Sequence, residues 1–393
     1  MVFTKKSSTG ADEENRRAVR AQRELKAFGE VYTPKDGRLT KSEIWWSQHY
    51  EWFKGHGYLL RPRYAPGWVP SWQGTMKNRF KCEDGRGSER GAILDGTRLS
   101  DGAYVTFKIV SNSDHPYEVE IGRFLSSEQL RRDPTNHCIP IYDVLSVPDD
   151  QDKVIIVMPL LREYTSPPFD TVGEAIECFR QLFEGLQFMH RNRVAHRDCM
   201  SLNIMMDASL LFVDPFHPIH PFMKRDFSGY ARFKTRTEQP VKYYFIDFGL
   251  SRRYDHSVTH PLEVPIWGGD KEVPEFQNSN EPRDPFATDV FYIGNTIRKD
   301  FIDSKDDFEF MRPLIVDMVQ ADPSKRPPMD EVVMRFETIR KGLSTAKLRS
   351  RVARKRETIA EATYLTVLHW SHRLKYVARR LPPVPLPPLN RQN

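Results

Sequence analysis

Cysteine is scarce in this chain of 393 residues, and no two of its cysteines form a Cys-x-x-Cys pair. A disulfide framework or a zinc knuckle needs closely spaced cysteines, so the spacing argues against both. We therefore expect a reducing, intracellular setting, cytoplasmic or nuclear. The four cysteines are Cys82, Cys138, Cys178 and Cys199.

Long apolar runs are also missing. The longest of note, VIIVMPLL at 154–161, is far shorter than the about 20 residues of a membrane-spanning helix. The first residues, MVFTKKSSTG, carry charge and no apolar core, unlike a secretory signal. With 39% hydrophobic and 28% charged residues, the composition indicates a folded globular protein, and we expect no transmembrane segment.

Acidic residues become scarce toward the C-terminus. From Lys341 onward the chain has twelve Lys and Arg but two Glu, a net charge of +10, whereas the whole chain carries +6. The residues before Lys341 are therefore net acidic. A basic tail can attract nucleic acid or an anionic membrane, and the simpler interpretation is a solvated, partly helical extension.

The chain divides by composition into four stretches. Residues 1–42 form a polar extension, and 43–80 hold five of the seven tryptophans. Because such rings are rarely left in water, we expect 43–80 to pack on the main domain, 81–342, with a peptide or ligand groove as the alternative. The tail, 343–393, is basic and ends in LPPVPLPPLN, a polyproline II segment that suits an SH3- or WW-type partner or a spacer.

Within the main domain, strands come first and helices later. The stretch 91–110 is predicted to form a hairpin, and CIPIYDVL and KVIIVMPLL further strands. Apolar residues at helical spacing predict long helices in FDTVGEAIECFRQLFEGLQFMHRNRV and MDEVVMRFETIRKGL. This order predicts an α+β fold with a small sheet-rich lobe followed by a larger helical lobe.

Two motifs carry the chemistry of this sequence. AHRDCMSLNIMMD contains His196, Asp198 and Asn203, and YYFIDFGLSRRY contains Asp247. Together they resemble the catalytic loop and the metal-binding motif of eukaryotic protein kinases, and Asp198 and Asn203 have the spacing that this pattern requires. The match extends over roughly 80–342 and resembles a divergent, fungal group of kinase-like proteins.

Further features follow in the order that the family has. VTFK places Lys108 at the strand lysine that grips the nucleotide phosphates, and EIGRF offers Glu120 as its ion-pair partner on the next helix. Glu118 and Glu120 point to different faces of that helix, and Glu120 is preferred because Phe124 would then face the core one turn on. The remaining matches, which would hold the site together, are Val273-Pro274-Glu275, Asp289 and Arg326.

The resemblance implies a two-lobed protein-kinase-like fold that binds ATP and Mg²⁺. Asp198 would orient the incoming hydroxyl and accept its proton, and Lys108 would contact the α- and β-phosphates. Asn203 and Asp247 would supply hard oxygen ligands for Mg²⁺.

The same resemblance places the adenine pocket after the strand VIIVM. Met158 would lie at the back of the pocket, and the carbonyl of Pro159 would face the adenine. Leu161 would then provide the backbone N–H.

The glycine-rich segment departs from the family pattern. Gly85, Gly87 and Gly91 read G-x-G-x-x-x-G, one residue longer than the usual loop, with Ser88 at the place of the middle glycine. The segment would cover the phosphates with its backbone N–H groups, less closely, or form an ordinary turn.

Two more departures lie near the catalytic motif. Met200 stands two residues after Asp198, where many serine/threonine kinases carry a lysine. A basic insertion at roughly 210–240 separates the two motifs, and a loop this long is usually functional. It would recognise substrate, regulate the site or brace the helical lobe.

The segment after Asp247 contains hydroxyls that a kinase could phosphorylate. Tyr254, Ser257 and Thr259 lie there, and Arg197 would pair with a phosphate on one of them. Phosphorylation is therefore predicted to raise activity.

The leading function is an ATP- and Mg-dependent protein kinase that transfers the γ-phosphate to a protein hydroxyl, with Ser/Thr favoured. One alternative is a pseudokinase scaffold that binds ATP weakly or without turnover. Met200 and the irregular glycine segment favour this alternative. The other is a small-molecule kinase on a related fold, against which the Val-Pro-Glu motif, Asp289 and Arg326 weigh.

Overall fold

The computed structural model describes residues 38–88, 90–266, 269–277 and 279–386. Most of the predicted polar extension lies outside this part of the chain. The contacts divide the chain into two compact units, which are described separately. Unit 1 comprises Met1–Val110, Tyr142–Leu160 and Asp214–Ala231, and unit 2 comprises Ser111–Ile141, Leu161–Val213 and Arg232–Asn393.

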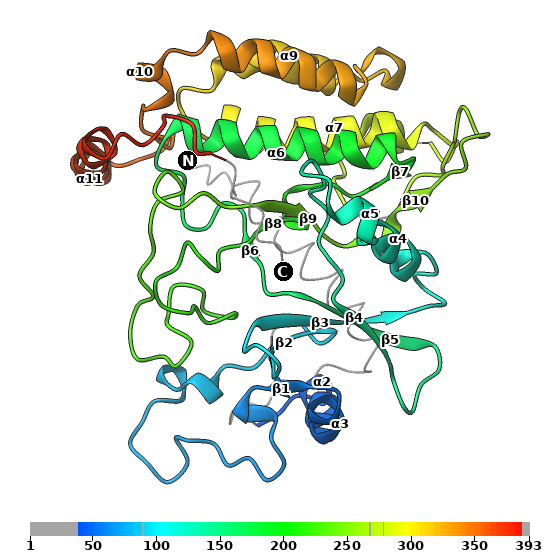
Figure 1. Cartoon of the computed structure of the whole chain (residues 1–393), viewed down its shortest axis with the longest axis vertical. Helices are drawn as coiled ribbons and strands as arrows, with labels where there is room; N and C mark the ends of the chain where they lie inside the picture. The colour runs from blue at the N-terminus through cyan, green and yellow to red at the C-terminus, as the bar shows by residue number, and fades with distance from the viewer. Residues whose placement is uncertain (1–37, 89, 267–268, 278, 387–393) are drawn as a thin grey trace, which may run out of the picture. The chain divides into compact units, whose positions relative to one another are not determined.

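Unit 1 is built on a sheet of five strands, β1 (Tyr58–Leu60), β2 (Ile93–Arg98), β3 (Tyr104–Ser111), β4 (Asp143–Ser146) and β5 (Lys153–Pro159). Their order is β1-β2-β3-β5-β4 (Figure 1). β2 and β3 form the predicted antiparallel hairpin, whose register places Ile93 opposite Lys108. Because side chains alternate along a strand, Val105 and Phe107 are buried and Lys108 is only half-buried.

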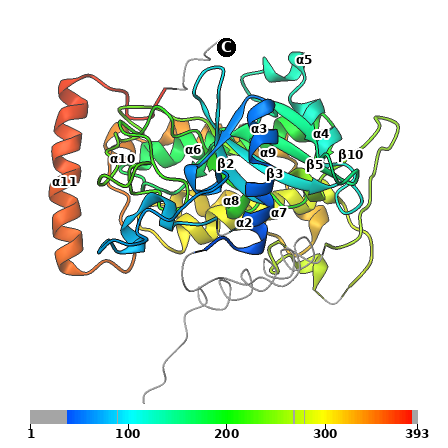
Figure 2. The same ribbon diagram turned by 90° about the horizontal axis from the view of Figure 1, so that it is seen from below.

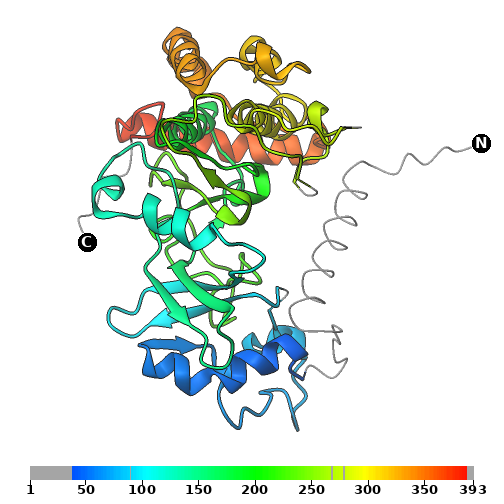
Figure 3. The ribbon, with the colours of Figure 1, turned by 90° about the vertical axis from the view of Figure 1, so that its right-hand side faces the viewer.

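The tryptophan-rich segment forms two helices, α2 (Lys41–Gln48) and α3 (Tyr50–Gly55), that pack on this sheet (Figure 3). α2 begins with a capping box, in which the side chains of Thr40 and Glu43 each accept from the other's backbone N–H. Trp46 is fully buried, its ring centroid lies 6.3 Å from that of Phe107, and its indole N–H donates to the Gly91 carbonyl. The segment thus supplies one layer of the core of unit 1.

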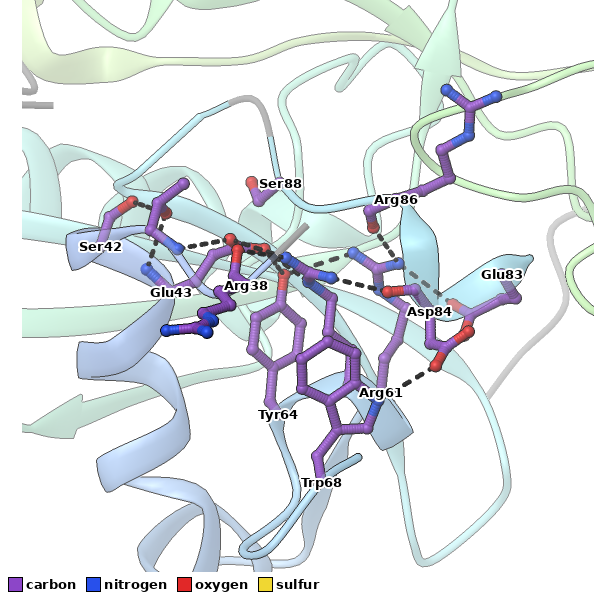
Figure 4. Close-up of polar contacts among 12 residues, drawn as sticks. Arg38, Ser42, Glu43, Arg61, Tyr64, Trp68, Glu83, Asp84, Arg86 and Ser88 are labelled. Atoms are coloured by element: carbon purple, nitrogen blue, oxygen red, sulfur yellow. Dashed lines mark hydrogen bonds and ion pairs between the residues drawn. The ribbon is translucent and has the colours of Figure 1, made fainter. Parts of the chain in front are cut away.

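Buried ionic side chains hold the long connection from β1 to β2 (Figure 4). Arg63 donates to both oxygens of the Glu43 carboxylate, at 2.8 and 3.1 Å, and to the Asp84 carbonyl at 2.6 Å. Arg63 and Glu43 are almost completely buried, so removing one would leave the other charge uncompensated. Three short 3₁₀ turns lie in this connection, η1 (Pro62–Tyr64), η2 (Arg79–Lys81) and η3 (Glu83–Gly85).

Unit 2 is largely helical. Its helices are α4 (Glu118–Leu125), α5 (Glu128–Arg131), α6 (Val172–Arg191), α7 (Pro285–Ile297), α8 (Arg312–Met318), α9 (Met329–Gly342), α10 (Thr345–Leu348) and α11 (Ile359–Ala378). Its strands are β6 (Arg162–Glu163), β7 (Val194–Ala195), β8 (Ile204–Met206), β9 (Tyr243–Phe245) and β10 (Arg252–Arg253). They form two small sheets, β10-β7 and β6-β8-β9. The short turns are η4 (Ser201–Asn203), η5 (Phe248–Leu250), η6 (Pro274–Phe276), η7 (Arg298–Ile302), η8 (Glu309–Met311) and η9 (Pro323–Lys325).

α6 is the central helix of unit 2, as its apolar spacing predicts. Thr171 caps its N-terminus, because the Thr171 side chain accepts from the Glu174 N–H at 3.2 Å. Along the helix, the Phe183 ring meets the ring of Phe336 on α9 at a centroid distance of 5.2 Å. α6 also contacts α7, and Figure 1 shows the three helices as neighbours. This packed group carries the loop from β7 to β8.

The insertion between β8 and β9 is divided between the units, since 214–231 belongs to unit 1 and its flanks to unit 2. In unit 1, Arg225 donates to the buried Asp95 of β2 at 2.6 Å. His217 lies 3.4 Å from Glu83 in the same unit. The sequence predicted a brace on the helical lobe as one possible role, and these contacts show that the middle of the insertion braces the sheet-rich unit.

The flank of the insertion in unit 2 is braced by Arg236. Its guanidinium is buried and donates to the carbonyls of Tyr164 and Pro167, at 2.8 Å each. Buried carbonyls need donors, so this arginine satisfies backbone that has no strand partner there. Arg236 is therefore a structural residue.

The described part of the C-terminal tail is folded rather than extended. The carbonyl of Pro383 packs against Gly173 at the start of α6, where a side chain would collide with it. Leu381 donates to the Tyr376 carbonyl at 2.9 Å, and Pro382–Pro385 are half-buried or buried. An SH3- or WW-type partner would therefore have to detach this part first. Among the described residues, no helix has the length and apolar character needed to cross a membrane.

Candidate active site

The loop between β7 and β8 is fixed by one buried carboxylate. Asp289 of α7 is fully buried, and its two oxygens accept the backbone N–H groups of His196 and Arg197 at 2.7 Å each. His190 lies 3.1 Å from the same carboxylate. Hydrogen bonds to a charged acceptor are among the strong ones, so Asp289 holds the position of the loop that carries Asp198.

His196 links the two predicted motifs. Its Nε2 lies 3.1 Å from the Ile246 carbonyl, and its Nδ1 accepts the Asp198 N–H at 3.2 Å. Burial lowers the pKa of His196, so the ring is neutral near pH 7 and donates through Nε2. The histidine therefore sets the distance between the Asp198 loop and the residue before Asp247.

Asp198 and Asn203 are brought together as the sequence predicts. The Asn203 amide nitrogen donates to the Asp198 carbonyl and to its Oδ2, both at 2.8 Å. These two bonds orient the amide, so its nitrogen faces Asp198 and its oxygen is turned away from it. Asp198 is half-buried and Asn203 is buried.

Asp247 lies in a left-handed turn between β9 and η5. Its φ of 67° is unusual for a residue with a side chain, and its Oδ1 accepts from the Gly249 N–H at 3.3 Å. Such strain tends to be kept where a side chain must be aimed. Phe248 is buried, with its ring centroid 5.5 Å from that of His196.

The Asn203 amide oxygen and the Asp247 carboxylate are the donor types that Mg²⁺ prefers. Mg²⁺ usually takes only one or two protein ligands and completes its shell with water and phosphate oxygens. Among the described residues, no cluster of three or more His, Cys, Asp or Glu is arranged to hold a metal ion. The donor set therefore fits Mg²⁺ held together with a phosphate ligand.

The helix α4 presents a different glutamate from the one predicted. Glu120 is exposed, whereas Glu118 is buried. The Glu118 carboxylate faces η5, since a Cβ built on Gly249 would lie 3.1 Å from its Oε2. Glu118 shares its face with the buried Ile121 and Leu125, one and two turns on. The predicted inner position of Glu120 is therefore wrong.

The nucleotide-side residues of the prediction are divided between the units. Lys108 lies on β3, and Met158 and Pro159 end β5, all half-buried in unit 1. Leu161 is buried at the start of the next stretch of unit 2. Their assignment to phosphate and adenine stays a prediction.

The glycines predicted either to cover the phosphates or to form an ordinary turn lie in closely packed surroundings. Gly85 ends η3 and packs against the Arg79 carbonyl, and Gly87 packs against the Glu43 carboxylate. At both positions a side chain would collide with these neighbours. Gly91 is buried and bonded to Trp46. Close packing thus explains these glycines, which favours the ordinary-turn interpretation.

Arg197 is already engaged by the segment that follows Asp247. Its guanidinium donates to the carbonyls of Leu250 and Val264, at 3.2 and 2.9 Å, and lies 3.3 Å from the Glu263 carboxylate. The Tyr254 hydroxyl donates to the other oxygen of Glu263 at 2.9 Å. Glu263, which the sequence analysis did not single out, therefore occupies the place foreseen for a phosphate.

Two more residues missed by the sequence analysis lie beside Asp198. Gly269 has a φ of 69°, and a Cβ there would be 2.5 Å from Asp198 Oδ1 and 3.1 Å from the Tyr292 hydroxyl. Burial and the neighbouring Asp198 raise the pKa of Tyr292, so its hydroxyl is a neutral donor. Glycine is needed at 269 for both its backbone conformation and its closeness to the carboxylate.

The end of this segment is fixed by the predicted pair of Glu275 and Arg326. Arg326 donates to both carboxylate oxygens, at 2.7 and 2.6 Å, and both side chains are almost completely buried. Such a two-pronged arginine–carboxylate pair is strong and specific in geometry. It joins η6 to the turn η9 near the start of α9.

These features define a two-lobed, kinase-like α+β fold. Over 153 residues, 38% of this chain, the sequence is 28% identical to the serine/threonine-protein kinase CAK1 of Saccharomyces cerevisiae. Over 148 residues, 34% of this chain, it is 27% identical to the NUAK family SNF1-like kinase 1 of Homo sapiens. The matches span only 28% and 21% of the lengths of these two relatives. No protein-family model matches the chain.

The fold and these relatives support a relationship to the protein kinase superfamily, of which this chain is a divergent relative.

Proposed function

We propose that this protein transfers the γ-phosphate of ATP, with Mg²⁺, to the hydroxyl of a protein, most readily Ser or Thr. The observation that carries the proposal is the pair of Asp198 and Asn203 on a loop held by Asp289. Both relatives are named as kinases, one of them as a serine/threonine-protein kinase.

In the proposed reaction Asp198 orients the acceptor hydroxyl and takes its proton. The hydroxyl oxygen forms a bond to the γ-phosphorus, and the bond from that phosphorus to the bridging oxygen breaks, so ADP leaves. Bound Mg²⁺ would neutralise phosphate charge, and Asn203 and Asp247 are the residues that would hold it. Lys108 would bind the α- and β-phosphates, and Glu118 takes the role that the sequence gave to Glu120.

The ion pair of Arg197 also bears on whether the segment after Asp247 needs phosphorylation. Arg197 and Glu263 form an ion pair in which both side chains are largely buried, at 6% and 22% exposed. A carboxylate there supplies the negative charge that a phosphate would bring. We therefore propose that activity does not need phosphorylation of Tyr254, Ser257 or Thr259.

The alternative is a pseudokinase, favoured by Met200 and by the closely packed glycines. No cation stands at Met200 to meet the γ-phosphate, and the glycine segment is occupied with its own neighbours. A protein of this kind would bind ATP and transfer nothing.

Phosphate transfer from labelled ATP separates the two functions. Wild type, Asp198→Asn and, as a control on the same loop, Leu202→Ala would be compared with Mg²⁺ and generic protein substrates. Leu202 is an exposed residue. Transfer that falls at least 100-fold in Asp198→Asn and persists in the control supports the kinase. ATP-dependent thermal stabilisation with no transfer in any variant supports the scaffold.

We also propose that the protein is intracellular, in the cytoplasm or the nucleus. All four cysteines are free and buried, which suits a reducing compartment.

A further inference from the structure

The helix α11 turns apolar side chains to the solvent. Tyr364, Val367, Trp370, Leu374 and Val377 are between 51% and 69% exposed. Their spacing of three and four residues places them on one face of the helix. A single exposed apolar residue is ordinary, but a stripe of five along one helix is a surface that another body usually covers.

The opposite face of α11 is fixed to unit 2 by polar contacts. The Tyr376 hydroxyl donates to Asp170 at 2.6 Å, and His369 lies 3.1 Å from the same carboxylate. Both side chains are buried. The apolar stripe cannot turn inward without breaking these bonds, and Figure 2 shows α11 beside α10 with its far side away from the other helices of unit 2.

Cations lie at both ends of the stripe. Arg354, Lys355 and Arg356 are exposed just before α11, and Arg379 and Arg380 are exposed just after it. Of these, Lys355 also donates to the Ile302 carbonyl at 2.6 Å, and Arg379 lies 3.2 Å from the Glu238 carboxylate. Arg373 lies over the ring of Trp370 at 4.7 Å. The chain from Lys341 onward carries a net charge of +10, so an anionic surface is the electrostatically complementary partner for this face.

We propose that the outer face of α11 binds an anionic lipid bilayer. A helix with an apolar stripe, aromatic Trp and Tyr side chains and flanking Lys and Arg lies in the plane of a membrane interface. From Tyr364 to Val377 the stripe runs roughly 20 Å along the helix axis, with a basic group beyond each end. The apolar side chains would enter the headgroup region while the cations meet anionic headgroups.

Other occupants fit these observations less well. A second copy would bring a second tail of like charge onto the first. Nucleic acid would use the cations and leave the apolar stripe in water. An acidic groove of a partner protein remains an outcome of the test.

The test is sedimentation of the full chain with vesicles. Vesicles of phosphatidylcholine alone and with about a third phosphatidylserine, a composition of strong negative surface potential, would be compared at low and high salt. Binding is expected to the anionic vesicles, to weaken with salt, and to fall at least tenfold in Leu374→Glu/Val377→Glu. The control Met334→Glu, at an exposed position on α9, is expected to bind as wild type does.

Three results with vesicles or in solution, and a fourth with polyglutamate, would overturn the proposal. The first three are no binding to anionic vesicles, equal binding by the double variant, and a concentration-dependent dimer that the double variant abolishes. Binding to polyglutamate in place of vesicles would point to an acidic protein partner and would also overturn it. Circular dichroism and the melting temperature check that the double variant is folded. Because α11 holds no residue of the proposed active site, this test is independent of phosphate transfer.

Discussion

At the scale of single residues, Asp289 decides the shape of the candidate site. Its two oxygens accept two backbone N–H groups of the loop that carries Asp198, and all of these atoms are away from water. An unmatched buried donor is expensive, so the loop has one favourable arrangement. The side chain itself need not contact substrate to control the reaction.

Asp289→Asn is expected to lower the stability by about 1–3 kcal/mol, because an amide NH₂ cannot accept one of the two N–H groups. Phosphate transfer should fall more than ATP binding, since the displaced loop carries Asp198. Thermal unfolding and labelled-ATP transfer measure the two effects. Asp207→Asn, at an exposed turn of the same unit, is the matched control, since its carboxylate caps one local N–H. Equal transfer in Asp289→Asn and wild type would contradict this view.

Glu118 and Glu120 provide an internal comparison on one helix. Glu118→Gln is expected to lower transfer at least tenfold, because the buried carboxylate faces the turn after Asp247. Glu120→Gln should change transfer less than about twofold, as exposed substitutions usually do. Rates at saturating and limiting ATP measure both variants. The reverse ranking would restore the assignment made from the sequence.

Glu263 allows the phosphate question to be tested directly. Glu263→Gln is expected to lower activity, because Arg197 loses its buried charge partner. Ser257→Ala/Thr259→Val should leave activity unchanged, since no phosphate is needed. The measurement is transfer by each variant before and after phosphatase treatment. Loss of wild-type activity after phosphatase would show that a phosphate is required after all.

At the scale of elements, local patterns predicted most of the secondary structure. The hairpin over 91–110 and the helix α6 follow from alternation and from helical spacing, and both are present. The sequence left the glycine segment open between a phosphate-covering loop and an ordinary turn, because its conformation depends on distant partners. Gly87 packs against Glu43, which lies far back along the chain in α2, and no local pattern records such a contact.

The error at α4 has a different cause, because the signal was present in the sequence. Ile121 and Leu125 stand three and seven residues after Glu118, which places all three on one face. Phe124 misled the assignment, since it is only half-buried under Arg253 at 3.5 Å. By contrast, the closeness of Asp198 and Asn203 could be predicted from residue order alone. The two residues are only five positions apart, and a hydrogen bond joins their side chains.

We expect the attachment of α11 to depend on pH. The Asp170 carboxylate, 3.3 Å from His372, raises the pKa of that histidine. Burial would raise the pKa of Asp170, but hydrogen bonds from His369 and Tyr376 and the neighbouring His372 outweigh it and lower that pKa. Protonated His372 stabilises the folded state below about pH 6.5, and this contribution is lost as the pH rises through its folded pKa. The contribution of ionised Asp170 is lost as the pH falls below about 4.

We therefore expect α11 to be held most firmly between about pH 4 and 6.5, where His372 is charged and Asp170 ionised. Amide hydrogen exchange of α11, compared with α6 at each pH and corrected for intrinsic rates, measures this. Protection should fall from pH 6 to 8, and His372→Gln should flatten that fall. Equal slopes in wild type and variant would remove His372 as the cause.

At the scale of the whole molecule, the chain passes back and forth between the two units. Unit 1 takes three separate stretches, the last of which is the middle of the insertion. Sequence patterns predicted an insertion near 210–240 but gave no sign of this division. The reason is that the deciding contacts, such as Arg225 with Asp95, join residues 130 positions apart.

Arg225→Leu is expected to destabilise unit 1 by about 2 kcal/mol, because the buried Asp95 loses one of its cations. Arg61, 3.1 Å from the same carboxylate, remains as the other. Hydrogen exchange should increase in β2 and β3 while α6 stays protected. Lys234→Leu, at an exposed position of the insertion, is the control. Uniform protection across both variants would show that the insertion does not support the sheet.

The same contact sets an order of events during synthesis. β2 leaves the ribosome with Asp95 in its middle, and Arg225 follows 130 residues later. At about 5–20 residues per second the interval is on the order of ten seconds. For that time the sheet of unit 1 must hold an acidic side chain whose second partner does not yet exist. The small unit, although it begins first, can be completed only after much of the larger one has been made.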